Sequence, residues 1–282
     1  MRNKITQYQK DFIKEFYENN GINFCIENLN LPKSTISSIA RRLNLNVKKN
    51  IVRKNMSKKN INIDDYKYVT DHRIAYILGL IWTDGHVSFA NNNSKTPIVK
   101  HSCVTYDSMN SNRIFKELGW KSFESENKKS IGKNNMTINW ISSRELGDYL
   151  INNNFRDKSK GTEIYKNICF SVLSHFLRGI LDGDGCITIS KSGKKYKQTA
   201  IYFSSTYDQD WYFLTKILDN LKIEYKHRLL VDNLGKSSQI YINKSQSINN
   251  LCEYIYKDSE FSRLERKYDK YQEFLNYKNS LN

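Results

Sequence analysis

The segments Ile77-Leu-Gly-Leu-Ile-Trp-Thr-Asp84-Gly85 and Leu177-Arg-Gly-Ile-Leu-Asp-Gly-Asp184-Gly185 lie one hundred positions apart and repeat one pattern. Each is an apolar stretch with a central glycine, and each ends in Asp-Gly. Because the first stretch is apolar on nearly every side, we expect a helix that is buried on more than one face. The repetition predicts a pair of matched helices, each with an aspartate at its carboxyl end.

Small residues recur four positions apart within both segments. Gly79 precedes Thr83 at this spacing, and Gly179 precedes Gly183 in the same way. Such spacing removes side-chain bulk along one face of a helix and lets two backbones approach closely. We therefore expect the two helices to pack through Gly79 and Gly179, which brings their acidic ends together.

The surroundings of the two segments repeat as well. Asp84-Gly-His-Val-Ser-Phe89 matches Asp184-Gly-Cys-Ile-Thr-Ile189, each an Asp-Gly turn that leads into a strand with alternating apolar positions. Further on, Ile138-Asn-Trp-Ile-Ser142 matches Gln239-Ile-Tyr-Ile-Asn243, a second strand before a helix. The order helix, two strands, helix, two strands, helix therefore fits both halves of the chain.

Both segments match the LAGLIDADG signature, and over residues 71 to 275 the chain resembles the LAGLIDADG homing endonucleases. The resemblance implies an α+β fold with two pseudo-symmetric αββαββα repeats, at 71–166 and 167–282, whose saddle-shaped antiparallel sheets flank the signature helices. Trp82 departs from the family pattern, which usually has an acid at this position, whereas Asp182 keeps it. We expect the Trp82 side chain to have a structural role, either in packing or in capping the helix.

The placement of Asp84 and Asp184 is electrostatically unfavourable without a further ligand. A carboxylate at the negative end of a helix, beside a second carboxylate, is destabilised. Oxygen-ligated Mg²⁺ would offset this repulsion and bind a phosphate. The resemblance implies a Mg²⁺-dependent site, with Mn²⁺ able to substitute, in which each aspartate serves one DNA strand. The expected metal ligands are Asp84, Asp184, Thr83 and Gly183.

Family members also use basic residues near the scissile phosphates, where positive charge stabilises the transition state. Lys128 and Lys226 are the candidates at roughly matched places in the two halves. Lysine is so frequent in this chain that a pair of this kind also fits ordinary solvated surface.

The N-terminal 48 residues predict three short helices and resemble a helix-turn-helix. Thr6 and Gln9 form a capping box, Gly21 ends the first helix, and Pro32 opens a third helix whose apolar face carries Ile36, Ile39, Ala40 and Leu43. Its opposite face would contact DNA through small polar groups and cations. Those residues are Lys33, Ser34, Thr35, Ser37, Ser38, Arg41 and Arg42. The alternative is a small helical cap with a solvated basic face.

A basic linker is expected at 49–70. Residues 46 to 60 contain no acid, so this segment would repel itself unless phosphates neutralise it. It would then follow a DNA backbone, although a plain solvated tether fits equally well. The linker and the end of the preceding domain supply the further DNA-binding candidates Lys48, Lys49, Arg53 and Lys54.

Composition supports a nucleic-acid partner. The chain has 282 residues, with 45 Lys and Arg against 29 Asp and Glu, which gives a formal charge of +16. A field of this sign attracts polyanions through counterion release. No apolar run approaches the roughly 18 residues that span a bilayer, and charges interrupt the start of the chain where a secretory signal needs an apolar core. We expect an intracellular protein that is not secreted.

The leading hypothesis is a site-specific homing endonuclease of a mobile genetic element, which cuts double-stranded DNA at a long target. It would act as a monomer because both catalytic halves lie in one chain. Two alternatives remain, a transcription regulator on the same scaffold and an RNA maturase that assists intron splicing. The retained Asp84 and Asp184 argue against the regulator, and the added DNA-type module argues against the maturase.

Overall fold

The computed structural model describes residues 5–46, 61–90, 94–125, 135–192, 196–232 and 235–280. The chain divides into two compact units, Met1–Asn60 and Ile61–Asn282, and each has its own hydrophobic core. Several residues predicted to bind DNA or to assist catalysis lie outside the described residues: Lys48, Lys49, Arg53, Lys54 and Lys128.

The described residues of the first unit form three short helices. α1 (Gln7–Leu29) begins at the predicted capping box between Thr6 and Gln9. Gly21, with φ 82° and ψ 176°, interrupts α1 and divides it into two helices, because glycine adopts positive φ without a side-chain clash. α2 (Lys33–Arg42) is the third helix. The three helices expected from the sequence are therefore confirmed.

The apolar face of α2 is shorter than the sequence predicted. Ile36, Ile39 and Ala40 are buried as expected, but Leu43 is 41% exposed. α2 ends at Arg42 and Leu43 is its C-cap, so the Leu43 side chain no longer continues the buried face of the helix.

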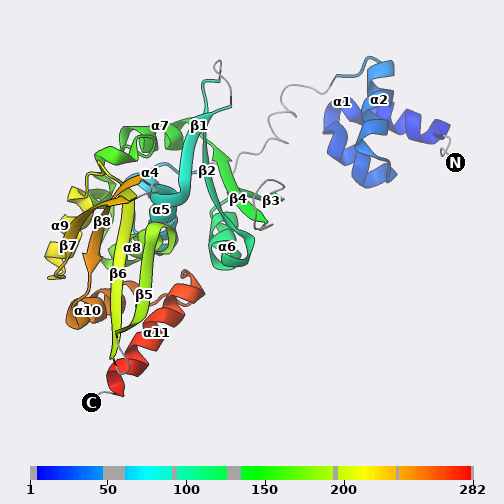
Figure 1. Cartoon of the computed structure of the whole chain (residues 1–282). Coiled ribbons are helices and arrows are strands. Elements are labelled where there is room, and N and C mark those ends of the chain that lie inside the picture. Colours follow the sequence, from blue (N-terminus) through cyan, green and yellow to red (C-terminus); the bar gives the residue numbers. More distant parts are fainter. Residues whose placement is uncertain are drawn as a thin grey trace. The chain divides into compact units, whose positions relative to one another are not determined.

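The second unit places two helices between two four-stranded antiparallel sheets. α5 (His72–Asp84) and α8 (Leu173–Asp184) lie side by side at its centre (Figure 1). The first sheet has the order β1-β2-β4-β3, and its strands are β1 (Gly85–Phe89), β2 (Pro97–Val104), β3 (Lys121–Ser125) and β4 (Met136–Ser142). The second has the order β5-β6-β8-β7, with β5 (Gly185–Ser192), β6 (Tyr196–Thr206), β7 (Lys226–Asp232) and β8 (Gly235–Ile242).

The remaining helices complete two repeats of the same order. The first repeat contains α6 (Met109–Glu117) and α7 (Arg144–Asn152), and the second contains α9 (Tyr212–Asn220) and α10 (Ser245–Tyr256). α11 (Glu265–Asn279) follows the second repeat and runs beside β5 (Figure 1). The predicted α+β fold, with two αββαββα repeats after N-terminal helices, is confirmed.

The contact between α5 and α8 depends on two glycines. A β-carbon added at Gly79 would lie 2.3 Å from the carbonyl oxygen of Phe176, and one added at Gly179 would lie 2.3 Å from the carbonyl oxygen of Tyr76. Any larger residue would force the helices apart. The close approach predicted from the four-residue spacing is therefore what the backbone shows.

Residues 61–70, which were expected to be part of the linker, belong to the second unit. Tyr66 lies in the short helix α4 (Asp64–Lys67), is buried, and accepts a hydrogen bond from Trp120 Nε1 at 3.2 Å. Val69 is fully buried and bridges to Ile168. The basic segment predicted from the sequence ends at Asn60, and the Tyr66 and Val69 side chains after it belong to the core of the second unit. None of the described helices has the length and apolar character needed to cross a membrane.

Candidate active site at the paired helix ends

Asp84 and Asp184 are the last residues of α5 and α8. Gly85 and Gly185 follow them directly and begin β1 and β5. A β-carbon on Gly85 would lie 2.3 Å from the carbonyl oxygen of Ile81, so only glycine allows the helix to pass straight into the strand. The local sequence thus places each acid at the junction of its helix and its sheet.

The structure brings the two acids close together. Asp84 Oδ2 lies 3.1 Å from the position that a β-carbon on Gly183 would occupy, next to Asp184 in the chain. Both side chains remain accessible to solvent at this end of the helix pair. Partial desolvation by the helix ends raises the pKa of Asp84 to about 6, and the negative charge of Asp184 contributes. Desolvation also raises the pKa of Asp184.

Two lysines bind the carboxyl ends of the signature helices. Lys158, in the 3-10 turn η2 (Lys158–Lys160), donates from Nζ to the carbonyl oxygens of Thr83 and Gly85, both at 2.7 Å. Lys267, at the start of α11, is 4% exposed. Its Nζ donates to the carbonyl oxygens of Leu181, Asp182, Gly183 and Gly185, at distances from 2.6 to 3.2 Å.

The charges of these lysines act on the acids. Both ammonium groups lower the pKa of Asp84 and Asp184, against the effect of desolvation. Burial in turn lowers the pKa of Lys158 to about 8, and it lowers the pKa of Lys267. Each cation also meets the negative end of a helix, where positive charge is favourable. The candidate site therefore has two carboxylates supported by two lysines.

Neither lysine is among the residues predicted from the sequence. The sequence predicts lysines at matched positions in the two repeats, but the segment between Asp184 and Lys267 is longer than that between Asp84 and Lys158. A usable signal was the position after the last helix of each repeat, since Lys158 follows α7 and Lys267 follows α10.

The candidate Lys226 lies elsewhere. It is exposed at the start of β7 and pairs in register with Tyr241 on β8. Tyr241 lies on the face of the sheet opposite to that of its buried neighbours Ile240 and Ile242. Lys226 therefore stands on the outer face of the second sheet, where a contact with a polyanion fits better than a role beside Asp184.

The predicted metal ligands differ in what their atoms contact. The carbonyl oxygens of Thr83 and Gly183 accept hydrogen bonds from Lys158 and Lys267, and the Thr83 hydroxyl donates to Leu80 O at 3.0 Å. No group of three or more His, Cys, Asp or Glu side chains that could hold a metal occurs within the described ranges. Of the four predicted ligands, Asp84 and Asp184 are the two with exposed carboxylates that could hold a metal.

Trp82 and Asp182 occupy equivalent positions with different surroundings. Trp82 is buried and packs edge-on against Phe155 and Phe213, with ring centroids 5.1 and 5.4 Å away. Asp182 is buried, and its Oδ2 accepts hydrogen bonds from Tyr76 Oη at 2.9 Å and from the Leu264 backbone N–H at 3.0 Å. Burial raises the pKa of Asp182 to about 6.

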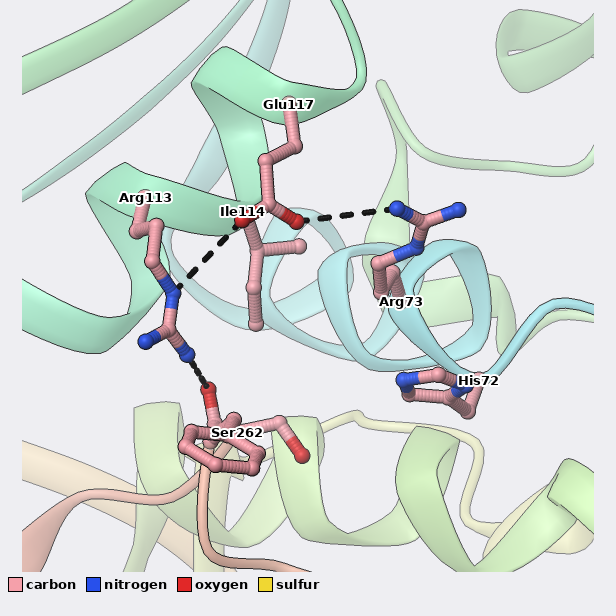
Figure 2. A pocket seen from close by; sticks show the side chains of 7 residues that line it. His72, Arg73, Arg113, Ile114, Glu117 and Ser262 are labelled. Carbon is pink, nitrogen blue, oxygen red and sulfur yellow. Dashed lines mark hydrogen bonds and ion pairs between the residues drawn. The ribbon is translucent and has the colours of Figure 1, made fainter.

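A pocket of about 360 Å³ lies at the other end of α5 and is not the candidate site. Its lining includes His72 and Arg73, and α5 extends about 18 Å from there to Asp84 at 1.5 Å per residue. Its charges are already paired. Glu117 interacts with Arg73 at 3.6 Å and with Arg113 at 3.7 Å, and Arg113 also donates to the carbonyl oxygen of Phe261 at 2.8 Å (Figure 2).

The predicted DNA-binding face of α2 is accessible. Lys33, Ser34, Ser37, Arg41 and Arg42 are exposed, whereas Thr35 and Ser38 are half-buried. Five of these seven residues are exposed, so this face of α2 is open to solvent.

Aromatic and cationic side chains meet on the outer faces of both sheets. Lys121 Nζ lies 4.8 Å from the ring centre of Trp140, and the guanidinium of Arg228 lies 3.3 Å from that of Tyr241. Trp140 and Tyr241 alternate with residues buried against the helices, so each stands on the solvent side of its sheet. Such pairs suit contact with phosphates and bases.

Comparison with known proteins identifies part of the chain. Residues 171–268 match the family described as LAGLIDADG-like domain. No curated protein sequence matches.

Similar solved structures include the I-SmaMI LAGLIDADG homing endonuclease bound to cleaved DNA, which is 13% identical over 73% of this chain and 90% of that chain, with a TM-score of 0.46. The I-LtrWI LAGLIDADG homing endonuclease bound to target DNA is 13% identical over 74% and 91%, with a TM-score of 0.47. The LAGLIDADG meganuclease I-AabMI bound to uncleaved DNA is 13% identical over 73% and 91%, with a TM-score of 0.48. The chain therefore carries a LAGLIDADG-like domain at residues 171–268, and the family resemblance expected from its repeated motif is confirmed.

Proposed function

We propose that this protein is a site-specific homing endonuclease that hydrolyses both strands of duplex DNA with a divalent metal, using one aspartate from each repeat. The observation that carries the proposal is the convergence of Asp84 and Asp184 at the ends of two closely packed helices, each end bound by a buried or half-buried lysine. Structural stability alone would avoid like charges at two negative helix ends.

The donor set fits Mg²⁺. This ion commonly binds through one or two carboxylates, keeps several waters, and completes its shell with substrate phosphates. Two accessible carboxylates without a larger cluster of ligands, among the residues that the structure describes, match that preference. A bound divalent cation would supply an activated water and would stabilise the leaving 3′ oxygen.

The chain's own residues then have distinct roles. Asp84 and Asp184 hold the cation and orient the phosphate of one strand each. Lys158 and Lys267 hold the carbonyl groups that precede and follow the acids, and so set the direction in which each carboxylate points. Their positive charge also stabilises negative charge that develops on the phosphate.

DNA binding would use the outer sheet faces and the first unit. The formal charge of +16 favours a long contact with the DNA backbone. The Lys121–Trp140 and Arg228–Tyr241 pairs lie on the outer faces of the first and second sheet. We propose residues 1–48 as a helix-turn-helix domain that adds affinity, and residues 49–60 as a basic linker. The catalytic unit would act as a monomer.

The proposal is tested with a plasmid library that carries the DNA flanking the protein's own gene. The wild type is expected to produce linear plasmid with Mg²⁺ and no cleavage with EDTA. Asp84→Asn and Asp184→Asn are each expected to abolish cleavage of one strand and to leave nicked or uncut plasmid. Specific binding without cleavage by the wild type would contradict a nuclease and favour the transcription regulator.

A further inference from the structure

Two buried polar side chains lie beneath the first sheet without a hydrogen-bond partner. His101 on β2 is 1% exposed, and Asn139 on β4 is fully buried. The two residues are directly opposite in the strand register. Both ring nitrogens of His101 and both amide atoms of Asn139 lack a hydrogen-bond partner among the described residues. An unsatisfied buried polar group costs on the order of 1–3 kcal/mol, so this pair needs an explanation.

The second repeat shows that the scaffold does not need polar residues here. In the first sheet, His101 pairs with Gly85 on one neighbouring strand and with Asn139 on the other. At the equivalent place in the second sheet, Phe203 pairs with Gly185 and with Ile240. Phe203 and Ile240 are both buried and apolar. The same backbone position therefore accepts an apolar pair in one half and carries a polar pair in the other.

The polar pair lies next to the Asp84 half of the candidate site. His101 is opposite Gly85, whose carbonyl oxygen binds Lys158. Burial lowers the pKa of His101 to about 4, and the charge of Lys158 adds to this effect, so the imidazole is neutral at physiological pH. One ring nitrogen is then a donor and the other an acceptor, while Asn139 offers both as well.

We propose that His101 and Asn139 bind internal water beneath the first sheet, and that this water positions Lys158 beside Asp84. Water is the ligand that fits, because it donates and accepts and because buried water needs two to four polar partners. The Lys158 ammonium has three N–H donors, of which two bind Thr83 and Gly85, and the third binds the water. The first catalytic half thus has a solvated support that the second half lacks.

A double-mutant cycle of folding stability, called the stability cycle below, tests the water site without any assay of activity. The variants are His101→Phe, Asn139→Ile and the double variant, which copies the pair of the second repeat. Each single change is expected to lower the midpoint of denaturation, because it displaces the water and leaves the other side chain unsatisfied. The double variant is expected to regain the wild-type midpoint or exceed it. If each single change instead stabilises the protein and the two effects add, no bound water links the pair and the inference is wrong.

A kinetic experiment tests the positioning of Lys158, and this part rests on the proposed nuclease function. With each DNA strand labelled separately, the double variant is expected to cut the strand served by Asp84 about 10-fold more slowly or worse, as for other groups that orient a catalytic residue. The KM for DNA and the rate on the other strand should not change. His101→Gln, which keeps a donor and an acceptor, should retain most of the rate.

The matched control is Ile240→Val in the second repeat, which removes apolar packing but no polar group. It is expected to lower stability and to leave the ratio of the two strand rates unchanged. An unchanged ratio in the double variant, or equal slowing of both strands, would overturn the positioning role. A wild type that cuts no DNA would refute the nuclease proposal alone, because the stability cycle still decides whether His101 and Asn139 share a bound water.

Discussion

The two repeats have the same order of elements but support the carboxyl ends of their signature helices with different side chains. In the first repeat, Trp82 packs against aromatic rings and Lys158 binds two carbonyl oxygens. In the second, Asp182 accepts hydrogen bonds and Lys267 binds four carbonyl oxygens. A duplicated backbone geometry can therefore be kept while the polar network beneath it changes.

The largest expected effect is a difference between the two lysines. Lys267→Met would leave four carbonyl oxygens without their cation, so we expect a loss of more than about 3 kcal/mol in the free energy of unfolding. Lys158→Met would leave two carbonyl oxygens without their cation, and we expect the free energy of unfolding to fall by about 1–3 kcal/mol. Chemical denaturation measures both. Equal losses would show that the two lysines support their helix ends equally.

The pH dependence of stability sharpens the contrast between Asp182 and Trp82. The pKa of Asp182 is raised to about 6 in the fold, so the folded protein binds its proton more tightly than the unfolded chain does. Its stabilising contribution is complete below the unfolded value near 4, and it is lost as the pH rises through about 6. The shift corresponds to a loss on the order of 3 kcal/mol.

We therefore expect the wild type to lose stability between about pH 4 and 7, and Asp182→Asn to show a flatter profile. Asp84, whose pKa is also raised to about 6, should contribute in the same direction. Unfolding curves collected across this pH range measure the slope. An identical slope in wild type and Asp182→Asn would assign the pH dependence to other groups.

The helix interface should be symmetric where the polar networks are not. A β-carbon at Gly79 or at Gly179 meets a carbonyl oxygen of the other helix at 2.3 Å. Gly79→Ala and Gly179→Ala are therefore expected to destabilise the second unit by similar amounts, about 1–3 kcal/mol. Differential scanning calorimetry of the two variants checks this. A large difference between them would mean that the helices relax unequally.

The smallest effects are expected in the first unit. Arg41→Ala and Arg42→Ala, on the exposed face of α2, should each weaken DNA binding and reduce the dependence of log affinity on log salt by roughly 1. The position of the cut should not change, because the acids lie in the other unit. Binding measured at several salt concentrations, together with mapping of the cut ends, tests this. A shifted cut position would give α2 a role in choosing the site.

Most of the element order could be predicted from the sequence, but the support of the site could not. The two Asp-Gly signatures and the alternating strands after them are local patterns, and the structure has the corresponding helices and strands. Lys158 and Lys267 are separated from the acids by most of a repeat, with segments of unequal length between. Nothing local distinguishes them from the many other lysines, and only folding brings them to the helix ends.

The two repeats, the close-packing glycines and the pair of acids follow from the sequence alone, because they depend on residue type and short-range spacing. The tertiary structure was needed to show which lysines bind the helix ends that carry the acids, and that Tyr66 and Val69 join the core. The same holds for the pairing of His101 with Asn139, where the second repeat pairs Phe203 with Ile240. These features arise from contacts between strands and helices far apart in the chain, so their energies depend on burial and on neighbours that no local pattern specifies.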